Sequence, residues 1–477
     1  MKIQNLKSFF TIAKQSSFAR NWSILTIAGI LSQFLGMIAT IRIARVLSPD
    51  GYGEYNIIQT FAAIGAVIGG LGLRNVLTRN VARAANKSMK LLITGGLLRA
   101  GSFLFSILLL YLYIIIIPGT LHISLMSIVF LILFSSLYWD LLESIAFGNK
   151  IMIMSGAINI AGSLIWVIFI WSMPNSLLTV VTVGFSFALL QLAKTISYFV
   201  MYSRKLPTGD EEIHTLRLIK DSFPFYWLDI LTAISNQIPI LFLAGNSSKA
   251  EVGFYNIGFR LLNPLQIFLY SALTSIYPSL AQKAVSDPKR YLQITQYFFL
   301  GISLVGTMIA LIISILRMDI VVLLFGLSYT HSADAMAYQC WYTVLYAMFC
   351  MIGISLAASD KQNWLAILST AYSTIALPFL WIGSQYGAVG LAIGILIAAC
   401  VNMVYHWIIF QRTSIKNISL MISLLIFVFP LIGFLLSFTF PQNLSIISKI
   451  SLIIVILILF GSYFYKKKTV IKEVLIR

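Results

Sequence analysis

The chain has 477 residues, of which 59% are hydrophobic and only 10% are charged, and its formal net charge is +18. A soluble protein of this length needs roughly a quarter of its residues charged to cover its surface. The composition therefore excludes a soluble protein and predicts one that uses lipid as much of its solvent. Because Lys and Arg occur in short clusters between apolar runs, the charge indicates membrane topology and argues against nucleic-acid binding.

Apolar runs long enough to cross a bilayer recur along the whole chain. A transmembrane helix needs about 20 mainly apolar residues. No cleavable signal precedes the first run, so we expect that run to stay in the membrane. The runs lie at 21–43, 55–73, 91–117, 124–147, 151–172, 176–202, 224–243, 252–278, 291–316, 336–357, 364–383, 388–411, 417–438 and 445–465. The sequence thus predicts an all-α integral membrane protein of about fourteen transmembrane helices.

The basic residues give an independent test of this topology. With the N-terminus in the cytoplasm, 25 of the 33 Lys and Arg residues fall in inside segments, 5 in outside segments and 3 within helices. That bias follows the positive-inside rule. We therefore expect a multi-pass protein of the bacterial inner membrane with both termini cytoplasmic. The longest outer loop, about 317–335, has no room for a catalytic domain.

A short internal repeat divides the chain into halves. Gly53–Ile57 (GEYNI) opens the second predicted helix and Gly253–Ile257 (GFYNI) opens the eighth, 200 residues later. Repeats of like orientation, related by an axis along the membrane normal, occur in several transporter architectures. The predicted organisation is a cytoplasmic N-terminal segment (1–20), an N-lobe (21–202), a cytoplasmic linker (203–223), a C-lobe (224–411), and two further helices with a basic tail (412–477).

The segment Ala44–Tyr55 (ARVLSPDGYGEY) resembles the first outer loop of Wzx-type O-antigen flippases, polysaccharide transporters of the MOP exporter superfamily. One departure is Ser48, where that family often has Gly; in a loop we expect little consequence. Further similar segments are Gly70–Arg74, Val252–Leu261, Leu324–Gly326 and Tyr386–Ala392.

The resemblance implies a MATE-like fold of two like-oriented six-helix lobes plus two C-terminal helices. It implies a flippase that moves an undecaprenyl-diphosphate-linked oligosaccharide, such as an O-antigen unit, from the cytoplasmic to the outer leaflet by alternating access. The expected partners are the lipid-linked oligosaccharide, membrane lipids, and a polymerase and glycosyltransferases of the same pathway. We expect a monomer that binds no nucleic acid.

Three cations lie deep inside predicted helices. Arg99, Lys194 and Arg260 are each eight residues from a helix end, which is about 12 Å at 1.5 Å per residue. Ionisable groups at that depth usually face a cavity or a partner. We expect the three to line a cationic cavity for the diphosphate, with Arg42 in its outer vestibule. The alternatives are snorkelling, interhelical pairing and, for Arg42, a solvated interface.

Carboxylates and amides form the second group of candidates. Asp140 and Glu143 share one helix face, and Asp229 lies near the start of the seventh helix. Pairing with cations such as Arg99 is the favoured interpretation, and proton or sodium coupling is the alternative. Asn236 and Gln237 either bind sugar hydroxyls or tie helices together. Pro239 in the same helix predicts a kink, and Arg74 is interpreted as a solvated helix end.

No catalytic, metal or cofactor site is predicted. The sequence contains no Walker loop, and its four histidines are scattered singly. Two related alternatives stay open, a multidrug antiporter, which should favour buried carboxylates, and a lipid II flippase. A membrane-embedded glycan polymerase or ligase is the alternative from another class, and the short outer loops argue against it.

Overall fold

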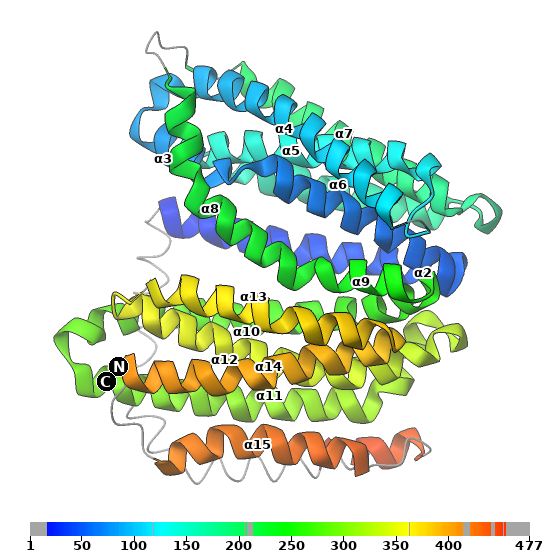
Figure 1. Ribbon diagram of the computed structural model, residues 1–477, viewed down its shortest axis with the longest axis vertical. Helices are drawn as coiled ribbons and strands as arrows, with labels where there is room; N and C mark the ends of the chain where they lie inside the picture. The colour runs from blue at the N-terminus through cyan, green and yellow to red at the C-terminus, as the bar shows by residue number, and fades with distance from the viewer. Residues whose placement is uncertain are drawn as a thin grey trace. The chain divides into compact units, whose positions relative to one another are not determined.

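The computed structural model describes residues 17–117, 119–204, 206–207, 213–361, 363–413, 420–439, 444–451 and 453–454. The residues in these ranges form helices joined by short turns, and none of them forms a β-strand (Figure 1). This confirms the predicted all-α class. In lipid, a helix satisfies every backbone N–H and C=O within its own segment, which is why apolar runs of this length become helices. The chain divides into two compact units, Met1–Gly245 and Asn246–Arg477.

The first unit begins with a long, interrupted helix and ends with a broken one. Its elements are α2 (Ser17–Gly70), α3 (Leu73–Arg83), η1 (Ala85–Lys87), α4 (Ser88–Ile116), η2 (Ile123–Leu125), α5 (Met126–Gly148), α6 (Ile153–Ser172), η3 (Asn175–Leu177), α7 (Val180–Ser203), α8 (Thr215–Asn236) and α9 (Ile238–Asn246). The contacts of α8 are with α2 and α3, so it packs as part of the first unit. The repeat assigns the same segment to the C-lobe, and those lobe boundaries stay a prediction.

The second unit consists mainly of long helices. Its elements are α10 (Lys249–Ser286), α11 (Pro288–Phe325), η4 (Leu327–Tyr329), α12 (Thr330–Ala358), α13 (Asn363–Ser384), α14 (Gly387–Thr413) and α15 (Leu420–Thr439). The core forms where α12 packs against α10, α11 and α14. The predicted span at 445–465 lies mostly outside the described residues. Its start is held by Lys449, whose Nζ donates to Asp319 Oδ2 of α11 at 2.7 Å.

The described residues contain nine helices long and apolar enough to cross a membrane, or ten with the bent pair α8–α9. The protein is therefore a multi-pass membrane protein, while the count of fourteen stays a prediction. One of the nine candidates runs for 43 residues, Ala28–Gly70 within α2. That is about 65 Å of helix, roughly twice the hydrocarbon thickness. Its length matches the two predicted spans 21–43 and 55–73, separated by a break at Ser48.

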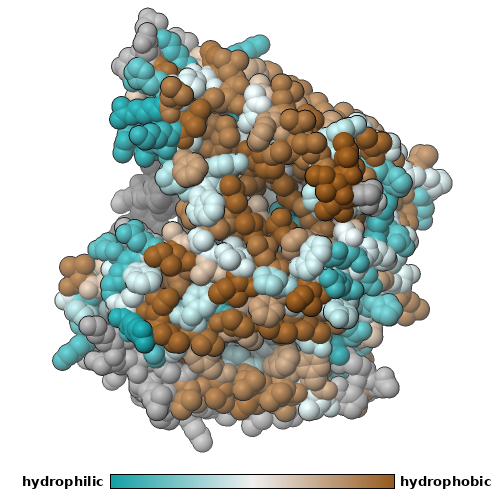
Figure 2. Space-filling view, viewed as in Figure 1, coloured by the Kyte–Doolittle hydropathy of each residue, from teal (hydrophilic) through white to brown (hydrophobic). Residues whose placement is uncertain are grey.

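The surface of each unit has the polarity expected of a membrane protein. Figure 2 shows apolar side chains over the middle of the helices and hydrophilic ones gathered near their ends. On α4, Leu97 is 71% exposed and Leu104 is 66% exposed. Exposed apolar areas of this extent are uncommon on soluble monomers. The helices thus present to lipid the residues that a soluble fold would bury.

The repeated motif makes the same contact in both units. Asn56 Nδ2 donates to the carbonyl of Tyr52 at 2.7 Å, and Asn256 Nδ2 donates to the carbonyl of Val252 at 2.9 Å. Both asparagines are buried. A buried amide within a membrane helix needs such a partner because water is absent. The matching bonds show that the two segments have equivalent local structure.

The motif Gly70–Arg74 contains the end of α2 and the turn into α3. α2 ends at Gly70, and Gly72 adopts a left-handed φ of 64° before α3 begins. A Cβ at Gly72 would lie 2.4 Å from the backbone nitrogen of Tyr226 in α8. Only glycine fits this approach. The turn lets α3 pack its buried face, formed by Leu73, Val76, Leu77 and Val81, against the first unit's core.

Ser48 has consequences that the sequence interpretation missed. Its φ is 62° and its ψ is 170°, a region occupied almost only by glycine that costs other residues about 1–3 kcal/mol. The following Pro49 further restricts Ser48. The expectation that serine here is of little consequence is therefore wrong on conformational grounds, and the frequent glycine of the resembling family has a physical reason.

We expect Ser48→Gly to stabilise the protein by about 1 kcal/mol, since relief of strain exceeds the added freedom of the unfolded chain. The measurement is the unfolding midpoint of the purified protein in detergent. Ser186→Gly, inside α7, is the matched control and should instead destabilise by roughly 0.5–1 kcal/mol. A Ser48→Gly protein no more stable than the parent would contradict the assignment of strain.

Candidate functional site

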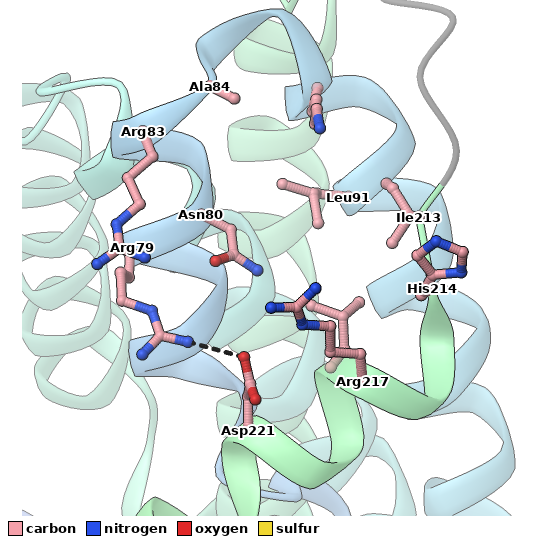
Figure 3. A pocket seen from close by; sticks show the side chains of 11 residues that line it. Arg79, Asn80, Arg83, Ala84, Leu91, Ile213, His214, Arg217 and Asp221 are labelled. Atoms are coloured by element: carbon pink, nitrogen blue, oxygen red, sulfur yellow. Dashed lines mark hydrogen bonds and ion pairs between the residues drawn. The ribbon is translucent and has the colours of Figure 1, made fainter.

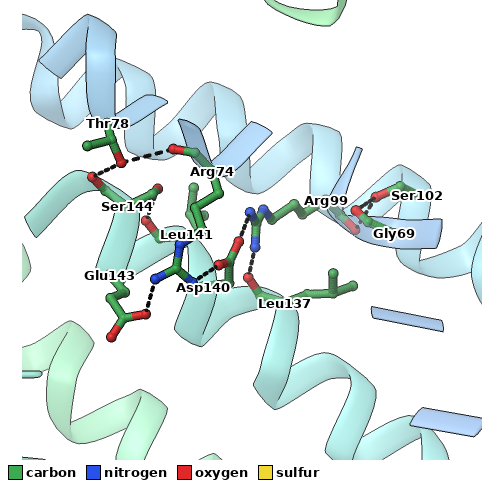
Figure 4. A network of polar contacts seen from close by, with 10 residues as sticks. All are labelled: Gly69, Arg74, Thr78, Arg99, Ser102, Leu137, Asp140, Leu141, Glu143 and Ser144. Carbon is green, nitrogen blue, oxygen red and sulfur yellow. Dashed lines mark hydrogen bonds and ion pairs between the residues drawn. The ribbon is translucent and has the colours of Figure 1, made fainter. Parts of the chain in front are cut away.

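A network of four charged side chains joins three helices of the first unit (Figure 4). Arg74 comes from the start of α3, Arg99 from the middle of α4, and Asp140 and Glu143 from one face of α5. Asp140 accepts from both arginines, at 2.5 Å from Arg74 Nη1 to Oδ1 and 2.5 Å from Arg99 Nη2 to Oδ2. Glu143 Oε2 accepts from Arg74 Nη2 at 2.7 Å. The positive charges of the two arginines therefore balance the negative charges of the two carboxylates.

Arg99 is the most deeply placed member of this network. Its side chain is 0% exposed, and besides Asp140 it donates from Nη1 to the carbonyl of Leu137. A guanidinium removed from water needs a paired, hydrogen-bonded carboxylate to stay charged. Its contacts thus favour the pairing interpretation over the cavity interpretation. Substrate binding by Arg99 stays a prediction.

Arg74 connects the network to the exposed end of the helices. Its side chain is 45% exposed and lies over the ring of Phe147, with Cζ 5.7 Å from the ring centre. Burial opposes its charge, but Asp140 and Glu143 outweigh that effect and raise the pKa of Arg74 above its ordinary value. The interpretation of Arg74 as a merely solvated helix end is incomplete, because this residue binds both carboxylates.

Glu143 extends the network to a fourth helix, α6. Its Oε1 accepts from Ser155 Oγ of α6 at 2.5 Å. Every carboxylate oxygen of Asp140 and Glu143 therefore has a described donor. Arg99 Nε is buried without a hydrogen-bond partner among the described residues, but the other contacts connect all four helices, and networks of this kind hold helices in one arrangement. The network is built to fix α3, α4, α5 and α6 together.

Lys194 on α7 lies near this network but outside it. Its Nζ donates to Gln191 Oε1 at 3.0 Å and lies 5.0 Å from the ring centre of Trp139. Gly162 of α6 makes room for the lysine stem, since a Cβ there would be 2.6 Å from Lys194 Cδ. Within the described residues no carboxylate lies within salt-bridge distance of Nζ. Ligand binding by Lys194 stays a prediction.

Arg42 occupies a different place from the deep cations. Its Nη2 donates to the carbonyl of Met173 at 3.2 Å, and its Cζ lies 5.5 Å from the ring centre of Trp171. Trp171 lies in the last turn of α6 and Met173 directly follows that helix, so Arg42 joins α2 to the end of α6. This position agrees with the predicted outer end of the first helix. Ligand binding by Arg42 stays a prediction.

The predicted amides lie at a break in a membrane helix. α8 ends at Asn236, α9 begins at Ile238, and the two axes differ by 42°. Pro239 near the start of α9 lacks an N–H and so favours a break at this position. Broken helices free backbone carbonyls, and in transporters they often line the binding site. The predicted kink is confirmed, and Asn236 and Gln237 stay candidates for sugar contacts.

Asp229 differs from the other two predicted carboxylates. It lies on α8, is exposed, and forms no salt bridge within the described ranges. Asp140 and Glu143 are both bound to arginine. Of the three candidates for ion coupling, Asp229 is the one whose charge is not already neutralised by an ion pair there.

Arg260 is the deep cation of the second unit. It lies eleven residues after Lys249, the first residue of α10, is exposed, and makes no ion pair among the residues that the structure describes. Asn263 follows one turn later on the same side of the helix. This amide was not predicted as a site residue, although its spacing from Arg260 is a readable signal. Gln266, three positions further along, donates to Thr343 Oγ1 at 3.4 Å.

The structure thus brings together some predicted residues and separates others. It joins Arg99, Asp140 and Glu143 through Arg74, and leaves Lys194, Asp229 and Arg260 outside ion pairs in the described chain. Among the described residues, no group of three His, Cys, Asp or Glu side chains could hold a metal ion.

Comparisons with solved structures agree with this architecture. The lipid II flippase MurJ, in an inward closed conformation, superposes with a TM-score of 0.72 at 16% identity, covering 93% of this chain and 99% of MurJ. A Vibrio cholerae MATE transporter, VcmN, gives 0.55 at 17%, covering 86% and 99%. An inward-facing multidrug resistance MATE transporter of the MOP superfamily gives 0.58 at 14%, covering 80% and 96%. At such identities the likeness establishes the fold and leaves the cargo open.

A comparison with curated protein sequences finds no match. A family model, described as polysaccharide biosynthesis protein, matches residues 18–284, which is more than half of the chain. The matched range includes the first-unit network, the broken helix α8–α9 and Arg260. The predicted MOP-type, MATE-like fold is confirmed by the superpositions. This chain therefore belongs to the polysaccharide biosynthesis protein family and has the fold shared by MurJ and the MATE transporters.

Proposed function

We propose that this protein is a flippase for an undecaprenyl-diphosphate-linked oligosaccharide, an O-antigen unit or a similar glycan. It moves this lipid from the cytoplasmic to the outer leaflet of the bacterial inner membrane by alternating access, with both termini in the cytoplasm. The family match supports a place in polysaccharide biosynthesis, and the fold supports transport. The charges of the deep side chains support an anionic cargo.

The observation that carries the proposal is the uncompensated charge of Arg260. An arginine at this depth is costly in lipid and is retained where it meets water or an anion. Its planar guanidinium suits bidentate binding of a phosphate. Because Asp140 and Glu143 are neutralised by Arg74 and Arg99, the deep charge left over is mainly positive. An anionic cargo fits this balance.

The alternatives make different demands on the same residues. A multidrug antiporter for cationic compounds needs available carboxylates, and two of the three predicted ones are held by arginine. A lipid II flippase is the chemically closer alternative, so lipid II is also tested as a cargo. A glycan polymerase needs an outer loop with catalytic residues, yet α11 and α12 are joined by Gly326–Tyr329 alone.

The test is a leaflet-sidedness assay with the full chain reconstituted in liposomes. A fluorescent undecaprenyl-diphosphate oligosaccharide is placed in both leaflets, and a membrane-impermeant quencher reports the fraction in the outer one. We expect protein-containing liposomes to expose nearly all of the probe, and protein-free liposomes about half. Equal movement of a neutral fluorescent phospholipid would contradict a specific flippase, and movement of lipid II alone would replace the proposed cargo.

The same assay addresses ion coupling. If a proton or sodium gradient drives transport, Asp229 is the first residue to test, because Asp140 and Glu143 are committed to ion pairs. Asp229→Asn should then remove the dependence of the transport rate on the gradient while leaving downhill movement. Transport that ignores a collapsed gradient in the parent protein would remove the coupling role from all three carboxylates.

A further inference from the structure

A basic pocket of the first unit lies apart from the charge network and Arg260. It forms where α3, η1 and the start of α4 meet the first turns of α8, and its volume is about 270 Å³ (Figure 3). Its polar lining includes Arg79, Arg83, Lys87, His214, Arg217 and Asp221. With a cytoplasmic N-terminus, the predicted spans alternate so that both contributing segments, 74–90 and 203–223, lie on the cytoplasmic side.

Positive charges outnumber negative charges among the residues that line this pocket. Four of the lining residues are Arg or Lys and one is a carboxylate. That carboxylate, Asp221, accepts at Oδ2 from Arg79 Nη2 at 3.1 Å, with both side chains 39% exposed. Arg83 and Arg217 form no ion pair within the part of the chain that the structure describes. Like charges converging on one concave surface raise the local concentration of anions.

The shape of the pocket limits what it holds. Ligand pockets usually measure roughly 300–1,000 Å³, and this one lies just below that range. Leu91 and Leu218 form a buried apolar wall, and Figure 3 shows Asn80 and Arg217 reaching into the space from α3 and α8. The site is large enough for a phosphate or diphosphate group and too small for an oligosaccharide.

The first turns of α8 indicate that the anion is attached to a lipid. Leu216 is 83% exposed and Phe223 is 65% exposed, with Ile219 between them. At spacings of three and four these residues lie on one face of the helix, whereas Arg217 and Asp221 lie on another. A helix with an exposed apolar face beside a basic one is typical of the membrane interface. The apolar face accommodates acyl or prenyl chains, and the pocket accommodates the headgroup.

We propose that this pocket binds the phosphate-bearing headgroup of a membrane lipid at the cytoplasmic surface. The headgroup oxygens accept charge-assisted hydrogen bonds from Arg83 and Arg217, the two arginines without an ion pair in the described residues. Arg79 is held by Asp221 and contributes less. Two lipids share this chemistry, a prenyl diphosphate such as the proposed cargo carries and an anionic phospholipid. The inference concerns a second site and does not rest on the proposed function.

The test is equilibrium binding to the purified full chain in neutral detergent. The probes are farnesyl diphosphate, dioleoyl phosphatidylglycerol and inorganic pyrophosphate. We expect the double variant Arg83→Gln with Arg217→Gln to weaken binding of at least one lipid probe about tenfold or more. Arg412→Gln, an exposed arginine on α14 outside the pocket, is the matched control and should bind as the parent does. Because the substituted side chains are exposed, thermal unfolding should not change.

A second variant reverses the sign of the effect. Asp221→Asn removes the lone carboxylate and releases Arg79, so it should tighten binding of the same probe by several-fold. Each titration is repeated in the Arg260→Ala chain, so that binding at the proposed transport site is measured separately. Loss of pocket binding with normal flipping, or the reverse, would therefore separate the two proposals.

The remaining outcomes decide between ligand sources. A tenfold effect confined to farnesyl diphosphate supports a headgroup of the cargo type, and one confined to phosphatidylglycerol supports a bulk membrane lipid. Pyrophosphate that binds as tightly as either lipid would overturn the lipid assignment. Unchanged binding of both lipid probes in the Arg83→Gln, Arg217→Gln protein would overturn the site itself.

Discussion

Asp140→Ala is expected to destabilise the protein by about 3–5 kcal/mol, the usual cost of leaving one partner of a buried ion pair without the other. The reason is Arg99, which is 0% exposed and has Asp140 as its ion-pair partner in the described chain. Total stabilities are commonly about 5–15 kcal/mol, so such a loss is large. The measurement is the yield of monodisperse protein and its unfolding midpoint in detergent.

Two comparisons make this prediction specific. Glu143→Ala should cost clearly less, because Asp140 remains to bind both Arg74 and Arg99. The double variant Arg99→Met with Asp140→Leu should recover most of the stability, since apolar replacements of a buried pair are often neutral. Asp140→Ala protein as stable as the parent would show that the pair does not compensate Arg99.

The double variant also separates the two interpretations of Arg99. If Arg99 serves mainly to pair with Asp140, the stable Arg99→Met, Asp140→Leu protein should still transport its lipid. We expect this result, because the described side-chain hydrogen bonds of Arg99 are both with α5. A well-folded double variant that has lost transport would instead restore the hypothesis that Arg99 contacts the cargo.

Arg260→Ala is expected to reduce transport strongly and leave stability almost unchanged. A charge-assisted hydrogen bond contributes about 1.5–3 kcal/mol, and 1.4 kcal/mol corresponds to a factor of ten. The apparent affinity for the lipid-linked oligosaccharide should therefore fall by roughly ten- to a hundredfold. The unfolding midpoint should hold, because Arg260 is exposed and makes no ion pair in the described residues. Initial flipping rates over a range of probe density give the measurement.

The controls for Arg260 separate charge from geometry. Arg260→Lys keeps the charge but loses the bidentate guanidinium, so it should fall between the parent and Arg260→Ala. Arg412→Ala changes an exposed arginine elsewhere in the second unit and should leave transport unchanged. Parent-like flipping by Arg260→Ala would remove this residue from the proposed binding site and, with it, the main support for an anionic cargo.

Helix ends show one limit of sequence interpretation. The apolar runs predicted spans at 291–316 and 336–357, yet α11 continues to Phe325 and α12 begins at Thr330. Apolar composition reports where the chain meets hydrocarbon, and a helix continues beyond that boundary as long as its backbone bonds are satisfied. The expected outer loop at 317–335 is therefore largely helical, and Arg317, one residue past the predicted end, is buried.

Local conformation shows another limit. The sequence displays Ser48 as an ordinary loop serine before a proline, and nothing in the residue type reveals its φ of 62°. That angle follows from how the two halves of α2 continue past the break. Gly72 is the opposite case, because its residue type already permits the positive φ that the turn into α3 requires.

The sequence by itself determined the solvent, the helical class and the faces on which charges lie, because composition and periodicity depend on residues near in the chain. It placed Asp140 and Glu143 together on one face of a helix and identified Arg99 and Arg260 as deep cations. Only the tertiary structure decided which of these charges cancel. Arg74 and Arg99 reach Asp140 across 66 and 41 positions of chain. Such pairing depends on how helices pack, and it separates the arginine that is neutralised from the one left available for a ligand.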